Sequence, residues 1–271
     1  MNMYAEVIII HKGREVDRAF HYALPDEWPG IPSGTRVLVP FGKGDTPYEG
    51  YITGFTDTIP FELNKLKKII KPLDDFPSLD KRMLNLLDWM RKKYFATGSD
   101  CIKCIVPSAV KSRGVNPANL TPDKTWLVLN KEQENAYFYI QKKIESNNLK
   151  PTLIHGVTGS GKTEIYLRLI SEMINRGKQV IVLVPEISLT PQMIEVFASR
   201  FGSLVSVTHS RLSAGMRYKE WNKARLGEIS VMIGTRSALF APFQSLGSFV
   251  RPAVRDQDKF LFWHFESLHI K

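Results

Sequence analysis

A glycine-rich segment at residues 156–163 constrains the fold of this chain more than any other stretch. It follows a short apolar run at 152–155, typical of a strand, and it leads into an apolar-periodic run at 164–173, typical of a helix. Strand, glycine-rich loop and helix in that order form the setting in which a phosphate-binding loop works. We therefore expect a nucleotide to bind here, and the candidate contacts are Gly156, Val157, Thr158, Gly159, Ser160, Gly161, Lys162 and Thr163.

The residue types of this segment have distinct roles in holding phosphate. Glycines permit positive φ and let the backbone approach the ligand, and the N–H groups at a helix N-terminus attract negative charge. The ammonium of Lys162 is expected to reach the β- and γ-phosphates, and the hydroxyl of Thr163 is expected to hold Mg²⁺. These two residues are the candidate catalytic residues, and Thr163 is the candidate metal ligand. The alternative is an ordinary Gly/Ser turn before a helix.

The chain has 271 residues, which is enough for two domains, and a formal net charge of +10. Its basic residues gather at Lys65, Lys67, Lys68 and Lys71, at Arg91 to Lys93, and at Lys142 with Lys143. Nucleic acid is a fitting partner for such a chain, although a solvated basic surface has the same composition. No run approaches the roughly 18 apolar residues of a membrane-spanning helix. The apolar run at 7–10 is too short for a signal peptide, so we expect a cytoplasmic protein.

The two cysteines, Cys101 and Cys104, form one C-x₂-C pair inside an apolar stretch. A structural zinc site needs four ligands, and no second pair of suitable spacing follows, so we expect no zinc site in this chain. A redox pair is an alternative, but no thioredoxin-like sequence surrounds these cysteines. Buried free thiols are the favoured interpretation.

Residues 1–107 are expected to form a small β-rich domain. Strand-like runs at 7–10, 19–24, 36–41 and 51–56 are separated by turn-forming residues rather than by helices. A helix should follow, with Ser78 as its N-cap. The apolar face of that helix is expected to consist of Met83, Leu86, Leu87, Met90 and Tyr94.

Residues 108–128 resemble a linker, and from residue 129 the pattern changes to alternating helices and strands. A helix is expected at 131–145 with Ala136, Ile140 and Ile144 facing inward. Strands at 152–155, 179–184, 204–208 and 229–233 then alternate with helices at 162–176, 190–201 and 213–226. Nearly continuous apolar strands between helices predict a parallel sheet covered on both faces. Residues 248–271 show no clear period and are an atypical tail that this pattern does not place in the sheet.

Several motifs together resemble one family. They stand at 156–166, 183–192, 209–215 with Trp221, and 234–243 in the second half of the chain, and at 17–22 and 34–42 in the first. In this order and spacing they are similar to the replication-restart DNA helicases of the primosomal protein N′ (PriA) family, over residues 4–107 and 127–247. The fold class implied is a β-rich DNA-binding domain followed by an incomplete P-loop (RecA-like) helicase lobe at 129–247.

The resemblance implies an ATP-dependent 3′–5′ DNA helicase of superfamily 2, with ATP and Mg²⁺ as cofactors, that acts in primosome assembly at stalled forks. Its partners would be forked or single-stranded DNA with a 3′ end, other primosome proteins and single-strand-binding protein. In the first domain, the resemblance assigns the DNA 3′ end to Phe20, His21, Gly42 and Lys67. Members usually have Asp where this chain has His21, so selectivity for the 3′ end is in question. Packing at a strand edge is the alternative for this cluster.

In the second half, Gln133 resembles the glutamine that reads adenine ahead of the phosphate loop. A side-chain amide can donate to and accept from the adenine edge. The segments around 185–192 and 234–237, with Thr235 and Arg236, resemble motifs that line the single-strand track. For Gln133, an exposed helix residue without a ligand is the alternative.

The chain also departs from the family. After Gly247, members continue an apolar strand into Asp-Glu-Glu-His, whose carboxylates hold Mg²⁺ and position water. This chain has Pro252, Arg255, Asp256 and Asp258 in that region. The second motor lobe with its arginine finger, the zinc-binding cysteines and the winged-helix insertion at 108–128 are also missing. The chain therefore looks truncated before the Walker B motif.

Three functions remain open at this point. The first is the family's helicase activity, and the second is an inactive ATP- and DNA-binding fragment that holds 3′ ends. The departures make enzymatic activity uncertain and favour the second for this polypeptide. The third, an unrelated P-loop kinase, fits less well with the net charge and with the 234–243 motif.

Overall fold

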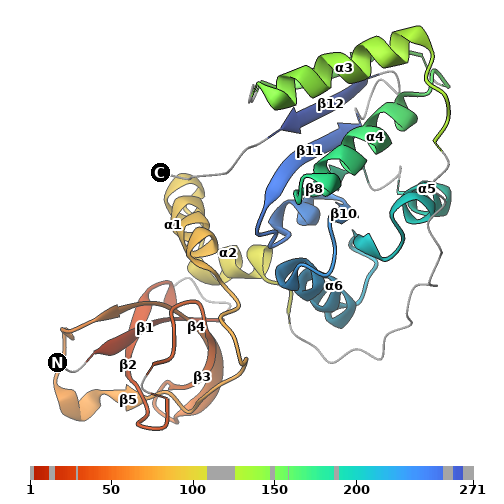
Figure 1. The fold of residues 1–271 in the computed structure, drawn as a ribbon. Helices are drawn as coiled ribbons and strands as arrows, with labels where there is room; N and C mark the ends of the chain where they lie inside the picture. The colour runs from red at the N-terminus through yellow and green to blue at the C-terminus, as the bar shows by residue number, and fades with distance from the viewer. Residues whose placement is uncertain are drawn as a thin grey trace. The chain divides into compact units, whose positions relative to one another are not determined.

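The structure is a computed structural model. It describes residues 3–11, 16–28, 30–108, 126–146, 150–157, 159–185, 189–252 and 259–264, with backbone alone for 251–252 and 259–264. The chain divides into two compact units, with the boundary between Val106 and Pro107. The first is coloured red to yellow in Figure 1 and the second green to blue. The helices of the described residues include none long and apolar enough to cross a membrane.

The first unit is built around one six-stranded sheet, as the sequence predicts for a β-rich domain. The strands are β1 (Tyr4–Ile9), β2 (Ala19–Ala23), β3 (Arg36–Phe41), β4 (Thr46–Thr56), β5 (Lys67–Lys68) and β6 (Lys71–Pro72), with a 3₁₀ turn η2 (Leu63–Lys65) before β5. They lie in the order β5-β2-β1-β4-β3-β6. Alternate β-branched residues, among them Val7, Val37 and Ile52, point to one side and form the core.

Two helices, α1 (Lys81–Tyr94) and α2 (Gly98–Ile105), complete the first unit. The predicted N-cap of the first helix is wrong. Asp80 is the cap and accepts from the Met83 amide at 2.9 Å, whereas the Ser78 hydroxyl donates to Asp74 instead. Tyr94 is also wrong as a core residue, because it stands 63% exposed at the last position of α1.

The two cysteines of α2 differ in their exposure to solvent. Cys101 is buried and Cys104 is exposed, and both are free. The prediction of buried thiols is therefore right for Cys101 and wrong for Cys104. Burial, with a smaller contribution from Cys104, raises the pKa of the Cys101 thiol, so Cys101 is a protonated packing residue rather than a reactive nucleophile.

The second unit is an α/β lobe. Its helices are α3 (Lys131–Glu145), α4 (Lys162–Asn175), α5 (Pro191–Phe201) and α6 (Ala214–Leu226), with 3₁₀ turns η4 (Gly202–Leu204) and η5 (Arg236–Phe240). Its strands are β7 (Thr152–His155), β8 (Gln179–Leu183), β9 (Val205–Thr208), β10 (Val231–Gly234), β11 (Leu246–Pro252) and β12 (Lys259–His264). These bounds confirm the predicted alternation, and the sheet order is β7-β12-β11-β8-β10-β9.

Both faces of this sheet are covered, as continuous apolar strands require. In β8, Val180 and Val182 face the core with α3, α4 and α5, while Ile181 faces the opposite core with α6 and η5. Figure 1 shows α4 lying across one face of the sheet and α6 near its other side. The predicted parallel α/β lobe is confirmed.

Residues 248–271, the atypical tail that the sequence pattern could not place, join the sheet in the part that the structure describes. Residues 248–252 belong to β11, which pairs with β8 in parallel, and residues 259–264 form β12, which lies antiparallel between β11 and β7. A strand in a sheet that is covered on both faces has no polar face and shows no alternation, which is why a periodicity argument misses it. Asp256 and Asp258 lie outside the described residues.

Candidate functional site

The glycine-rich segment forms the connection between the carboxyl end of β7 and the N-terminus of α4. Gly159 and Gly161 have φ of 82° and 79°, in the left-handed region where other residues are strained. A Cβ on Gly161 would also stand 2.3 Å from the side-chain nitrogen of Gln133. Conformation therefore favours glycine at position 161, and a side chain there would also displace the Gln133 amide. Thr158 lies outside the described residues.

Lys162 begins α4, and its ammonium folds back over the loop. It donates to the carbonyl oxygens of Gly156, at 2.5 Å, and Val157, at 2.7 Å. Thr163 follows on the exposed side of the first turn, where its side chain hydrogen-bonds with Tyr166. A bound phosphate would exchange these weak local contacts of Lys162 for charge-assisted ones, which are stronger.

Gln133 reaches this loop from α3. Its side-chain oxygen accepts from the Asn130 amide at 2.9 Å, which completes a capping box, and its nitrogen donates to the Ser160 carbonyl at 2.8 Å. The structure thus brings the candidate adenine-reading residue into direct contact with the candidate phosphate loop. Local sequence patterns could not predict this contact, because 27 positions separate Gln133 from Ser160.

A second cluster beside the loop escapes sequence reasoning. Glu164, 7% exposed on α4, lies 3.3 Å from Arg168 and 3.5 Å from Arg200 of α5. Both guanidinium groups lie near the ring of Trp126, at 5.5 and 4.9 Å from its centroid, and Arg168 also donates to the carbonyl of Leu127. The cluster holds the segment before α3 against α4. Glu164 stands off the apolar stripe of Ile165, Leu169 and Met173 on α4, so helical periodicity predicts an exposed residue there and gives no signal for the cluster.

The strand that should carry the Walker B carboxylates is β11. It runs parallel to β8, with Val250 opposite Val182, so it occupies the expected place in the sheet. Its described sequence ends in Arg251 and Pro252 and contains no Asp or Glu. No group of three or more His, Cys, Asp or Glu residues within the described ranges could hold a metal ion. Thr163 stays the candidate Mg²⁺ ligand predicted from the sequence, and it would share the ion with the nucleotide.

The candidate residues of the single-strand track follow β10. Thr235 precedes η5 without a side-chain capping bond, and Arg236 is exposed at the start of that turn. Because β7, β8 and β10 are parallel, these residues and the phosphate loop lie at the same edge of the sheet, the usual ligand edge of α/β folds. Of the segment 185–192, residues 186–188 lie outside the described residues.

In the first unit, two of the predicted DNA-end residues are in contact. Lys67 donates to the Gly42 carbonyl at 2.7 Å and forms an ion pair with Asp45 at 2.5 Å. Phe20 lies edge-on to Phe41, the residue before Gly42, at 5.0 Å between ring centroids. Phe20, Gly42 and Lys67 are therefore associated through the β3–β4 turn.

His21 does not join these residues. Side chains alternate along a strand, and that of His21 lies 3.8 Å from Glu6 and beside the ring of Phe61, while Phe20 and Tyr22 pack against the core. The residue of β2 that lies beside Lys67 is Tyr22, which the sequence analysis did not single out. It is opposite Lys67 in the sheet and donates its hydroxyl to the Pro40 carbonyl at 3.0 Å.

Tyr22 makes the first unit sensitive to alkaline pH. Burial, with the charge of Asp45, raises its pKa from 10.0 to about 12. The unfolded chain releases this proton at lower pH than the folded unit does, so stability is present below pH 10 and is lost between pH 10 and about 12. From pH 9 to pH 11 we expect the wild type to lose about 1 kcal/mol more than Tyr22→Phe. Urea unfolding at both pH values measures the difference, and equal losses would contradict the assignment.

Comparison with known proteins follows the same division into two halves. Residues 6–107 match the family described as 3′DNA-binding domain (3′BD), and residues 132–260 match the DEAD/DEAH box helicase family. The relatives described as replication restart protein PriA include proteins from Bacillus subtilis, Treponema pallidum and Haemophilus influenzae. The one from Bacillus subtilis (strain 168) is 52% identical over 124 residues, 46% of this chain and 15% of the relative.

The other two relatives match across both halves. The protein from Treponema pallidum (strain Nichols) is 33% identical over 245 residues, 88% of this chain and 36% of the relative. The protein from Haemophilus influenzae (strain Rd) is 36% identical over 318 residues, 88% of this chain and 43% of the relative. The chain therefore spans less than half the length of each of these three relatives.

Proposed function

The chain belongs to the PriA family of replication restart proteins, and from this premise we propose that it binds a DNA 3′ end with its first unit and ATP·Mg²⁺ with its second. The observation that carries the proposal is the hydrogen bond from Gln133 to the Ser160 carbonyl, which brings the candidate base-reading amide to the candidate phosphate loop. The whole relatives are described as replication restart proteins. A role of this chain at forked DNA, with other primosome proteins and single-strand-binding protein, is part of the proposal.

The nucleotide half rests on four groups. The N–H groups of the loop and of the first turn of α4 receive phosphate oxygens, and the ammonium of Lys162 neutralises them. Thr163 is exposed at the start of α4, and in this proposal its hydroxyl binds the Mg²⁺ that accompanies the nucleotide. Bound Mg²⁺ would neutralise charge on the phosphates. Gln133, beside Ser160, offers an amide to the base.

Hydrolysis has less support than binding. The described part of β11 brings Arg251 rather than a carboxylate to the place where the family holds its water-positioning residues. We therefore propose that this chain retains bound ATP with little turnover, and that the family's 3′–5′ helicase activity is the alternative. The alignment with the Haemophilus relative covers 318 positions, more than the 271 residues of this chain, so that relative contains residues without a counterpart here.

ATP hydrolysis by this chain tests the proposal, measured with and without forked DNA that carries a 3′ end at the branch. Retained binding of fork and ATP with negligible turnover is the expected result. DNA-stimulated turnover that disappears in Lys162→Ala would instead establish the helicase alternative. Failure to bind either ligand would remove the proposal altogether.

Gln133 supplies a test of the base-reading half. Gln133→Ala removes the amide next to Ser160 and one bond of the capping box, so we expect about 1 kcal/mol of lost stability and weaker discrimination between ATP and GTP. Binding of fluorescent ATP and GTP analogues measures the discrimination. Glu134→Ala, on the next residue of α3, is the matched control. Unchanged preference for ATP in Gln133→Ala would place the base elsewhere.

Lys67 supplies a test of the DNA half. Its ammonium is held by Asp45 and the Gly42 carbonyl, so a DNA terminus must displace or share those contacts. We expect Lys67→Gln to weaken binding of a fork with a free 3′-hydroxyl by about 10-fold, as loss of a charge-assisted contact does. Lys68→Gln, on the neighbouring exposed residue, is the control. Equal effects of the two changes would indicate a general electrostatic contribution and no pocket.

A further inference from the structure

The C-terminal end of α1 presents an aromatic and basic surface that the proposed function does not use. Trp89, Tyr94 and Phe95 are 49%, 63% and 90% exposed, and the rings of Trp89 and Tyr94 meet edge-on at 5.6 Å. Lys92 and Lys93 lie between them in the sequence and are exposed. We propose that these five residues, the α1 surface, bind single-stranded DNA away from its ends.

The cations of this surface are available to a ligand. Arg91 lies 3.6 Å from Asp17, which fixes it within the unit. Lys92 and Lys93 form no ion pair with any residue that the structure describes. The acidic residue of α1 nearest to these lysines is Asp88, one helical turn before Lys92. Lys92 and Lys93 follow Trp89 by three and four positions, so all three lie on the same side of the helix.

Phe95 is held in a conformation that is unfavourable for its type. It follows the last residue of α1 with φ of 51° and ψ of 33°, the left-handed region where glycine or asparagine usually ends a helix. A phenylalanine there bears backbone strain and also leaves its ring in water. Packing does not explain a phenylalanine at this position, because 90% of it is exposed. A ligand that covers the ring would explain it.

Single-stranded DNA fits the chemistry of this surface better than other partners. Exposed rings stack on unpaired bases, and neighbouring ammonium groups hold the phosphates between them. Trp89 and Tyr94 are five positions apart, about 7.5 Å along α1, which is about two stacked nucleotides at roughly 3.4 Å each. The net charge of +10 favours a polyanion over an acidic peptide of mixed sequence. Single-stranded DNA is favoured over duplex DNA, because paired bases would leave the rings no stacking partner.

The test uses the full chain and a closed circular oligonucleotide of thymidines, without nucleotide. A circle has no 3′ end, so the result is independent of the proposed 3′-end site and of ATP. The variants are Tyr94→Ala, Phe95→Gly, and the double change Lys92→Gln with Lys93→Gln. The matched controls are Lys81→Gln, in the first turn of α1, and Phe138→Ala, an exposed ring on α3.

Each aromatic change is expected to weaken binding of the circle by at least about 5-fold, the lower limit for loss of one stacked base. The double lysine change should make the dependence of log affinity on log salt shallower by about 1.4, at 0.7 per phosphate. Phe95→Gly should leave thermal stability unchanged or higher, because glycine adopts the left-handed conformation without strain. The controls should bind as the wild type does.

Two outcomes would overturn the proposal. One is an affinity for the circle that is the same in all three variants, in the control variants and in the wild type, when all of these proteins are folded. The other is loss of self-association in Tyr94→Ala or Phe95→Gly, measured by sedimentation, with DNA binding intact. That second result would make the α1 surface a protein contact.

Discussion

Lys162→Ala is expected to lower the affinity for ATP by about 100-fold while fork binding is retained. Each charge-assisted hydrogen bond to phosphate contributes roughly 1.5–3 kcal/mol, and the ammonium of Lys162 is the cation at the loop. In the structure this ammonium contacts the carbonyl oxygens of Gly156 and Val157. Its removal exposes two carbonyls to water, so we expect little change in the stability of the folded lobe.

Titration with a fluorescent ATP analogue measures the effect of Lys162→Ala. Lys142→Ala, on an exposed residue of α3, is the control for a change in net charge. Lys162→Arg separates charge from shape, because a planar guanidinium keeps the charge but does not replace an ammonium in a narrow loop. ATP affinity in Lys162→Ala equal to that of the wild type would show that the glycine-rich segment is an ordinary turn.

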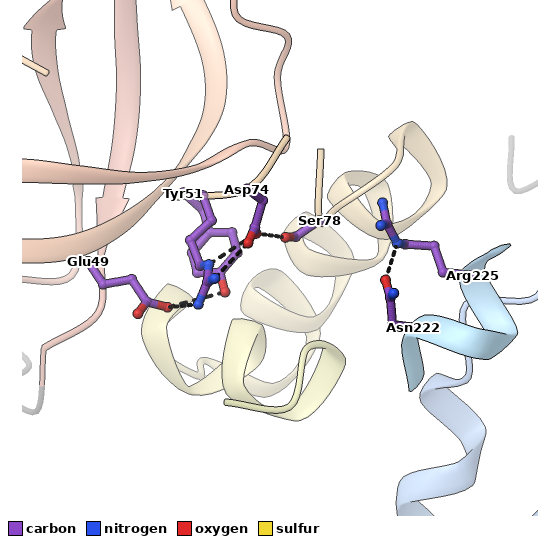
Figure 2. Close-up of polar contacts among 7 residues, drawn as sticks. Glu49, Tyr51, Asp74, Ser78, Asn222 and Arg225 are labelled. Carbon is purple, nitrogen blue, oxygen red and sulfur yellow. Dashed lines mark hydrogen bonds and ion pairs between the residues drawn. The ribbon is translucent and has the colours of Figure 1, made fainter. Parts of the chain in front are cut away.

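Arg36→Ala is expected to destabilise the first unit by about 3–5 kcal/mol, because it leaves a half-buried carboxylate without its partner. Arg36 on β3 is 9% exposed and donates to both oxygens of Asp74, at 3.0 and 2.6 Å. Glu49 lies 3.6 Å away, and the hydroxyl of Ser78 donates to Asp74 from the other side. Figure 2 shows Asp74 between the strand residues and Ser78.

Arg36 stays charged in this setting. Burial by itself would lower its pKa, but the hydrogen bond with Asp74 and the charges of Asp74 and Glu49 outweigh burial and raise the pKa. The pair joins β3 to the segment that leads into α1, and the amide of Leu73 donates to the Arg36 carbonyl beside it. Loss of Arg36 should therefore loosen α1 as well as the sheet.

Urea unfolding of the first unit, followed by circular dichroism and tryptophan fluorescence, measures the loss. The double variant Arg36→Met with Asp74→Leu is the informative control. Apolar residues of similar size often replace a buried ion pair with little loss, so the double variant should recover most of the stability. A loss below about 1 kcal/mol in Arg36→Ala would mean that water solvates Asp74 and that the pair is ordinary surface.

Local patterns predicted the elements of this protein well. The predicted helices at 131–145, 190–201 and 213–226 correspond to α3, α5 and α6, and glycines stand where φ is positive in the glycine-rich loop. The caps of these helices, Asn130, Thr190 and Ser213, were not predicted, although each accepts from the amide three positions on. Each of these features involves residues a few positions apart, so their physics is visible in the sequence. The position of His21 could also have been predicted, because adjacent strand residues face opposite sides.

The sequence by itself predicted helices α1 and α3 to α6, the parallel strands β7 to β10 and the family of this protein, and it marked the candidate phosphate loop. It gave no prediction of α2 or β11. Only the tertiary structure decided that β12 enters the sheet between β11 and β7, and that Arg36 meets Asp74, 38 positions away. It also decided that Lys67 meets Gly42, and that Trp126 lies beside Arg168 and Arg200. The reason is physical. Periodicity and capping act between near neighbours along the chain, whereas strand partners and buried charge pairs depend on the free energy of packing the whole unit.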